Sequence, residues 1–280
     1  MSILQKAAES VNKRHRAIPA DYERTIRRAA QRLLVRAGAA EPPIDVRRLA
    51  ELQGVLDIRE ADLGSTDAQL TQVDGGYLIE VNRYGSPRRK RFSIAHEIAH
   101  TFFKPRVRAF RHTTGTVTIT KEKPSDVVEE ILCDIAASEL LMPREQFISS
   151  SRALPVSIDT VERLSDQFDT SIEATALRYG TVNGEKFQMV VWSRRHSGLT
   201  PKWSIGERVV SPSAFAVRNP TNSVQWSVAR ALLTDERVQA NDPDLSAYPP
   251  RRVWVEAKAF RRGPGRYVLT ILRSAFSEGR

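Results

Sequence analysis

The chain has 280 residues, of which 41% are hydrophobic and 27% charged, enough for one large domain or two modest ones with real cores. No apolar run approaches the roughly 18 residues of a transmembrane helix, and the first residues lack the apolar core of a signal peptide. Cys133 is the only cysteine, which excludes an internal disulfide and leads us to expect a cytoplasmic protein that does not bind membranes.

The net charge of +10 is spread unevenly along the sequence. Residues 184–280 carry 16 basic against 8 acidic side chains, whereas residues 1–183 carry 27 against 25. A basic C-terminal part favours an acidic partner such as nucleic acid. Because the arginines are scattered rather than clustered, we favour a solvated basic surface, and an acidic partner stays the alternative.

Two helices are expected at the start of the chain. Residues 21–37 place apolar side chains at helical spacing, with Asp21 as the N-cap and Gly38 as the stop. Residues 44–54 predict a second helix, with Asp45 as its N-cap.

A short strand and a hairpin are expected next. Residues 55–58 have the composition of a strand, and residues 69–73 and 77–81 flank the turn signal Asp74-Gly75-Gly76. Residues 83–91 then predict a basic connector that leads into a helix.

The most informative run is Arg91-Phe92-Ser93-Ile94-Ala95-His96-Glu97-Ile98-Ala99-His100. Its apolar positions recur at the spacing of an α-helix, on which residues four apart lie on one face. His96 and His100 can therefore point both imidazoles at one metal ion, while Glu97 can reach a water bound to that ion. The spacing predicts a zinc site in which Glu97 is the catalytic base.

A catalytic zinc site needs three protein ligands and one open position, so a third ligand is expected from a neighbouring element. The helix predicted at residues 126–141 offers Glu129 and Glu130, and His112 is a further alternative. We select Glu130, because Asp134 lies four residues later on the same helix face. There Asp134 could accept the outer N–H of a ligand histidine and fix its orientation.

The rest of the sequence predicts a helix pair followed by strands. Residues 160–168 and 171–179 form the pair, which could read DNA as a helix-turn-helix but is more often an ordinary packing unit. A domain boundary is expected near residue 184, and residues around 232 fit either a helix or a strand. Further strands are predicted at residues 113–120, 187–192, 203–210, 253–260 and 267–272.

Two of these segments together resemble the ImmA/IrrE family of zinc metallopeptidases. One is the run at residues 91–100, and the other is Glu130-Ile131-Leu132-Cys133-Asp134-Ile135-Ala136-Ala137-Ser138-Glu139-Leu140-Leu141-Met142-Pro143. The family pattern is a RFxxAHExxH helix followed by an ExxxN/D…AAxLLMP helix. Residues 43–46 and 168–179 are similar too, so the resemblance covers roughly residues 25–180.

This resemblance implies a zincin-like fold, a Zn²⁺ cofactor and a protein substrate, often a DNA-bound repressor whose cleavage releases stress or mobile-element genes. Longer members similar to IrrE add a helix-turn-helix segment and a GAF-like tail, which the length and β-rich C-terminal part of this chain would allow. Ala99 stands where the family often has Gly, and Asp134 where it often has Asn. Both changes leave the expected ligands in place.

We therefore expect an α+β protein in three parts. A zincin-like metallopeptidase domain, mainly helical with a small antiparallel sheet, is predicted at residues 1–150. A helix-turn-helix-like pair is predicted at residues 151–183, and a β-rich α/β domain, interpreted as a GAF-like sensor, at residues 184–280.

The predicted function is zinc-dependent cleavage of a protein partner, a helix-turn-helix transcriptional repressor. One alternative is a non-catalytic regulator that binds protein or nucleic acid. Another is a peptide deformylase-like amidase, which the lack of a cysteine motif among the expected ligands disfavours.

Overall fold

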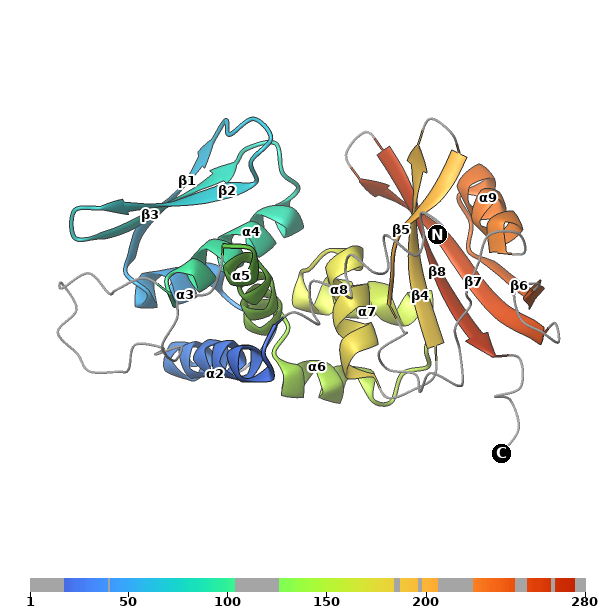
Figure 1. Ribbon diagram of the computed structural model, residues 1–280, viewed down its shortest axis with the longest axis horizontal. Coiled ribbons are helices and arrows are strands. Elements are labelled where there is room, and N and C mark those ends of the chain that lie inside the picture. The colour runs from blue at the N-terminus through green and yellow to red at the C-terminus, as the bar shows by residue number, and fades with distance from the viewer. Residues whose placement is uncertain are drawn as a thin grey trace. The chain divides into compact units, whose positions relative to one another are not determined.

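The computed structural model describes residues 18–39, 41–103, 126–183, 187–195, 198–205, 224–244, 251–262 and 265–274. His112 and the strand predicted at residues 113–120 lie outside these ranges. The chain folds into two compact units (Figure 1). The N-terminal unit draws its described residues from 18–147 and 165–171, and the C-terminal unit draws them from 148–164 and 172–274. The domain limits expected at residues 150 and 183 stay a prediction.

The first helix of the N-terminal unit is α2 (Ala20–Ala37). Gly38 ends it as predicted, with φ 64° and its N–H bonded to carbonyls in the last turn. The predicted cap at Asp21 is wrong, because Pro19 occupies the N-cap position and Asp21 lies in the first turn. A carboxylate there still faces the positive end of the helix dipole, so it is favourable without capping.

The second helix is α3 (Val46–Leu52), and Asp45 is its N-cap as predicted. One oxygen of Asp45 accepts the backbone N–H groups of Arg47 at 2.9 Å and Arg48 at 3.2 Å. These are N–H groups that the first turn of a helix leaves without a carbonyl partner.

A three-stranded sheet follows, formed by β1 (Val55–Ala61), β2 (Ala68–Val73) and β3 (Gly76–Asn82) in the order β1-β3-β2. The predicted hairpin of β2 and β3 is confirmed. The expectation of an antiparallel sheet is wrong, because β1 pairs with β3 in parallel. The chain reverses once between β1 and β2 and again in the hairpin, so β1 and β3 run the same way.

Two helices that pack against each other form the centre of this unit: α4 (Pro87–His100) and α5 (Asp126–Leu141). Figure 1 shows α4 between the three strands and α5. The helix α4 begins earlier than predicted, because Ser86 caps it and Pro87 occupies its first turn. Part of the expected basic connector is therefore helical.

Three shorter helices follow: α6 (Arg144–Ser151), α7 (Ile158–Phe168) and α8 (Ile172–Val182). The pair α7 and α8 was predicted, with starts two residues too late for α7 and one too early for α8. The helix α6 was not predicted, because most of its residues are polar and leave no helical stripe.

The C-terminal unit contains a five-stranded sheet in the order β5-β4-β8-β7-β6, with every neighbouring pair antiparallel. Its elements are β4 (Phe187–Arg195), β5 (Gly198–Ile205), α9 (Val224–Thr234), β6 (Val238–Asp244), β7 (Arg251–Arg262) and β8 (Gly265–Ser274). The strands predicted at residues 187–192, 253–260 and 267–272 are confirmed as parts of β4, β7 and β8. The strand predicted at residues 203–210 overlaps β5 only at residues 203–205, and its remaining residues lie outside the described ranges. β6 was not predicted, and the ambiguous residues around 232 are helical.

Both faces of this sheet are covered within the unit. On one face, α9 packs Val228 and Ala231 against a core that includes Trp192 and Val255. On the other face, Tyr179 of α8 stacks on Phe187 of β4, with ring centroids 5.6 Å apart. The neighbouring strands β4 and β8 therefore bury apolar side chains on both faces, which is why their sequences contain nearly continuous apolar runs.

No helix in the described part of the chain combines the length and the apolar composition that crossing a membrane requires.

Candidate metal centre

The two histidines of the HExxH run lie one turn apart on the face of α4 that meets α5. Their ring centroids are 5.0 Å apart in an edge-on arrangement, and the side chains of His96 and His100 are only 17% and 15% exposed. Spacing by four residues on a helix produces this proximity, as the sequence predicted.

The nitrogens of His96 face two carboxylates of α5. Nδ1 lies 3.0 Å from Asp134 Oδ1, and Nε2 lies 3.1 Å from Glu130 Oε2. With Nδ1–H donating to Asp134, Nε2 keeps its lone pair for a metal. The structure thus places Asp134 and Glu130 on opposite nitrogens of one imidazole.

The ring of His100 shows the same pattern with a different outer partner. Its Nε2 lies 3.4 Å from Glu130 Oε1, and its Nδ1 lies 3.1 Å from Glu129 Oε1. Glu130 therefore directs one oxygen at each histidine Nε2. Sequence reasoning considered Glu129 only as an alternative ligand and missed this contact with the outer nitrogen of His100.

The surroundings of His96 favour a positive charge. Burial would by itself lower the pKa of His96, but the hydrogen bond to Asp134 and the charges of Asp134, Glu97 and Glu130 outweigh it and raise the pKa above its ordinary value. A pocket that stabilises a proton on the imidazole in this way also stabilises a metal cation.

Glu97 lies directly after His96 on α4 and is buried. Its negative charge acts on both His96 and Cys133, so its carboxylate lies close to the same centre. This is the position that a base acting on a metal-bound water would need.

Cys133 is a further member of the centre that sequence reasoning missed. It is fully buried on α5, and one ligand atom from each of Cys133, His96 and His100 lies within 4.8 Å of the others, a group that could hold a metal ion. A signal was present in the sequence, because Cys133 follows Glu130 by three residues and therefore shares its helix face.

The structure thus offers two candidates for the third ligand, Glu130 and Cys133. We favour Glu130, because its oxygens lie at 3.1 and 3.4 Å from the two Nε2 atoms, close to the roughly 3.3 Å between ligands of a tetrahedral zinc. Burial and the neighbouring carboxylates raise the pKa of the Cys133 thiol, which holds it protonated in the metal-free chain. Two imidazoles with a carboxylate and a thiol are a donor set that fits zinc.

Arginines at the start of α4 anchor the helix that carries the histidines. Arg91 donates to the carbonyl of Ile44 at 2.9 Å and pairs with Asp169 Oδ2 at 3.0 Å. Arg88 donates to Ser165 Oγ at 2.9 Å and to Asp166 Oδ1 at 2.7 Å. No local sequence pattern could reveal these contacts, because the partners lie tens of residues away.

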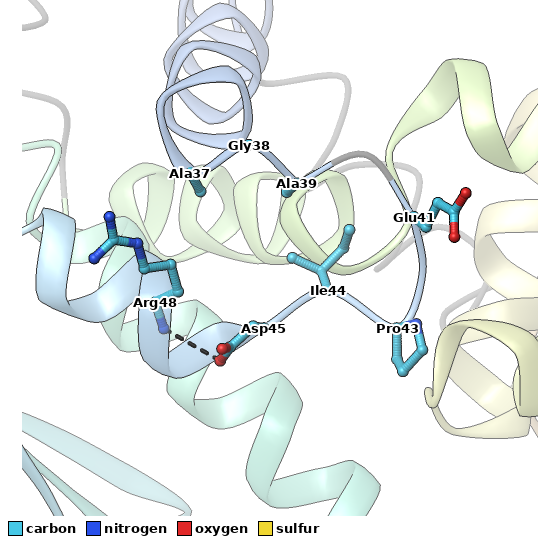
Figure 2. Close-up of a pocket in the computed structure, with 8 residues that line it drawn as sticks. All are labelled: Ala37, Gly38, Ala39, Glu41, Pro43, Ile44, Asp45 and Arg48. Atoms are coloured by element: carbon cyan, nitrogen blue, oxygen red, sulfur yellow. Dashed lines mark hydrogen bonds between the residues drawn. The ribbon is translucent and has the colours of Figure 1, made fainter.

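A cavity of about 460 Å³ lies elsewhere in the N-terminal unit, between the end of α2 and the start of α3 (Figure 2). It is lined by Ala37, Gly38, Ala39, Glu41, Pro43, Ile44, Asp45 and Arg48. Among the residues that the structure describes, the cavity lining and the metal centre share no member. It therefore gives no support to the predicted chemistry.

A comparison with protein-family models points to the part of the chain that contains the candidate metal centre. Residues 50–179, which include α4 and α5, match the family model described as the IrrE N-terminal-like domain, Peptidase_M78. The fold is similar to that of a Mycobacterium tuberculosis transcriptional regulator, with a TM-score of 0.61, 16% sequence identity and 98% of each chain covered. Among curated proteins, no match to the sequence was found.

Proposed function

We propose that the chain is a zinc-dependent endopeptidase, because its residues 50–179 match the family model described as the IrrE N-terminal-like domain, Peptidase_M78. The observation that carries the proposal is the meeting of His96 and His100 Nε2 on the single carboxylate of Glu130. Three ligands from two helices leave one coordination position open, as a catalytic zinc requires.

Each side chain then has one task. When bound, zinc supplies a water of lowered pKa and polarises the carbonyl of the peptide bond. The carboxylate of Glu97 accepts a proton from that water and passes it to the leaving amine nitrogen. Asp134 and Glu129 hold the outer nitrogens of His96 and His100, which keeps both rings aimed at the metal.

The sheet of the N-terminal unit supports an extended peptide as substrate. β2 lies at an edge of this sheet and also packs against α4, the helix that carries the histidines. A substrate strand can pair with the backbone of such an edge, which aligns one peptide bond with the metal. We therefore propose that β2 positions the substrate.

The proposed substrate is a DNA-binding transcriptional repressor, cleaved in stress or mobile-element regulation. The structural likeness to a transcriptional regulator supports a role in transcription. It also favours the second candidate function, a regulator that binds protein or nucleic acid without cleaving it. The basic C-terminal part of the chain supports this second candidate, because positive charge favours binding to nucleic acid.

The substitution Glu97→Gln separates the two candidates, because glutamine keeps the shape of the side chain but cannot accept the proton. We expect the variant to keep its zinc and its fold and to lose cleavage by roughly 100-fold or more. Cleavage is followed by mass spectrometry of candidate repressors incubated with the protein, with and without zinc. The matched control is Glu145→Gln, at an exposed position of α6.

A Glu97→Gln protein that binds its target without cutting it would also capture the natural substrate. If this variant performs the full cellular function of the wild type, the peptidase proposal is wrong and the binding function takes its place.

A further inference from the structure

A thiol at the metal centre is the feature that the proposed mechanism leaves unused. Glu130, Cys133 and Asp134 stand at positions i, i+3 and i+4 of α5, so their side chains leave the helix on one face. Glu130 and Asp134 both contact His96 from that face. Cys133 is fully buried between them and has no disulfide partner, because it is the only cysteine of the chain.

The sulfur of Cys133 also lies close enough to His96 and His100 for the three side chains to bind one metal ion. The sulfur of Cys133 and one nitrogen each of His96 and His100 lie within 4.8 Å of one another. Ligands of a tetrahedral zinc, with bonds of about 2.0 Å to nitrogen and 2.3 Å to sulfur, lie about 3.5 Å apart. The separations given by the 4.8 Å limit exceed this spacing by about 1.3 Å at most, so small shifts of the three side chains would bring these atoms onto one ion.

We propose that Cys133 is a fourth protein ligand of the metal, so that the resting site is closed. The proposal rests on the proposed zinc site and adds a ligand to it. As the sulfur–zinc bond forms, the thiol proton passes to solvent and the water in the open position leaves. His96, His100, Glu130 and Cys133 then fill all four positions, as in a structural zinc site.

A closed site has a direct consequence for the proposed chemistry. Glu97 has no metal-bound water to deprotonate while sulfur occupies the fourth position. Cleavage then requires that water or the substrate carbonyl displaces Cys133. The zinc-bound chain would thus be inactive until Cys133 leaves the metal. The ease with which Cys133 is displaced would then control peptidase activity.

Cobalt substitution tests this inference without any need for peptidase activity. Co²⁺ is added to the full chain from which metal has been removed, and the near-ultraviolet spectrum is recorded. A cysteine thiolate bound to cobalt gives an intense charge-transfer band, and Cys133 is the only residue that can supply it. We expect the band in the wild type with one cobalt per chain, and its loss in Cys133→Ser with cobalt still bound.

The matched control is Ser138→Ala, which changes a partly buried side chain of the same helix and should keep the band. Competition with a chromogenic chelator provides a second readout. Cys133→Ala should bind zinc more weakly by at least the roughly 10–100-fold that loss of an outer partner typically costs.

The outcomes distinguish this inference from the proposed function. Stoichiometric cobalt binding by the wild type without a thiolate band would overturn the role of Cys133 and leave the three-ligand zinc site in place. Failure of the wild type to bind cobalt or zinc at all would overturn both. If Cys133→Ser does not fold, the presence or absence of the band in the wild type still decides whether Cys133 binds the metal, because the chain has no second cysteine that could produce it.

Discussion

Each imidazole nitrogen of the candidate metal centre faces a carboxylate, and the carboxylates differ in what they can contribute. Glu130 meets the Nε2 atoms of both histidines, whereas Asp134 and Glu129 each meet one Nδ1 atom. A group shared by both inner nitrogens can bind the ion directly. A group on an outer nitrogen acts only through the ring that it orients.

This division predicts an order of zinc affinities. His96→Ala removes an imidazole ligand and should abolish stoichiometric zinc binding, and Glu130→Ala should lose more zinc affinity than the variants of the outer partners. Asp134→Ala and Glu129→Ala remove only the outer partners and should weaken binding by roughly 10–100-fold. Metal analysis after dialysis, followed by chelator competition, measures both effects. Equal losses for Glu130→Ala and Asp134→Ala would move the third-ligand role to another side chain.

A buried carboxylate in the C-terminal unit predicts a pH-dependent stability. Burial raises the pKa of Glu256, against the lowering effects of the Ile158 N–H and the charge of Arg237. A raised pKa means that the folded chain holds this proton more tightly than the unfolded chain does. The stabilisation is therefore complete below the ordinary pKa of 4.5 and is lost as the pH rises through the raised value.

Glu256→Gln should remove the loss of stability that accompanies rising pH, because the amide oxygen can accept the same Ile158 N–H but the side chain carries no charge. We expect the variant to gain stability relative to the wild type as the pH rises from 4 toward neutrality, measured by chemical denaturation of the full chain. Glu162→Gln is the matched control, since it removes a carboxylate from a partly exposed pair with Lys258. A constant difference between Glu256→Gln and wild type across this range would contradict the assignment.

At the scale of elements, an ion pair joins α2 to α5, the helix that carries Glu130. Arg27 Nη1 lies 2.9 Å from Glu139 Oε2, and the Glu139 side chain is only 1% exposed. The other oxygen of Glu139 accepts the backbone N–H of Arg144 at 3.0 Å. A carboxylate buried in this way depends on its partners, because water cannot replace them.

Arg27→Ala should therefore lower the free energy of unfolding by about 1–3 kcal/mol, the usual cost of a buried polar group that loses its partner. Arg24→Ala is the matched control on the same helix, because the pair of Arg24 with Asp21 is largely exposed and such pairs contribute little. Chemical denaturation of the two variants measures the difference. Equal effects would mean that the pair with Glu139 contributes no more than the exposed pair.

At the scale of the whole molecule, the helix that carries the histidines depends on residues far along the chain. Arg88 and Arg91 of α4 are held by Ser165, Asp166 and Asp169, which belong to the N-terminal unit. The same short segment packs Phe168 against Phe147, with ring centroids 5.1 Å apart. A catalytic domain that ended at residue 150 would lack all of these contacts.

A fragment of residues 18–150 should therefore bind zinc more weakly and unfold at a lower temperature than a fragment of residues 18–183. The longer fragment keeps the partners of Arg88 and Arg91, so α4 stays oriented toward α5. Calorimetric unfolding and zinc titration of the two fragments measure the difference. Equal zinc affinity and equal unfolding temperature would show that residues 165–171 are dispensable for the metal centre.

The sequence by itself determined the features that neighbouring residues specify. Asp45 and Gly38 cap helices through bonds to their own surroundings, and the turn after β2 is encoded in adjacent glycines. The four-residue spacing of His96 and His100 predicted their proximity on the same grounds. Where the local signal was weak, as in the polar helix α6 and the polar strand β6, the element was not predicted.

Only the tertiary structure decided which distant residues meet. The parallel pairing of β1 with β3, the anchoring of Arg91 by Asp169, and the approach of Glu129 and Cys133 to the histidines all join parts of the chain with no periodic relation. Helical spacing places Glu130, Cys133 and Asp134 on one face of α5, but only the packing of α5 on α4 brings that face to the histidines. Local patterns fix the direction of a side chain along its own element, whereas its partner depends on how the elements pack.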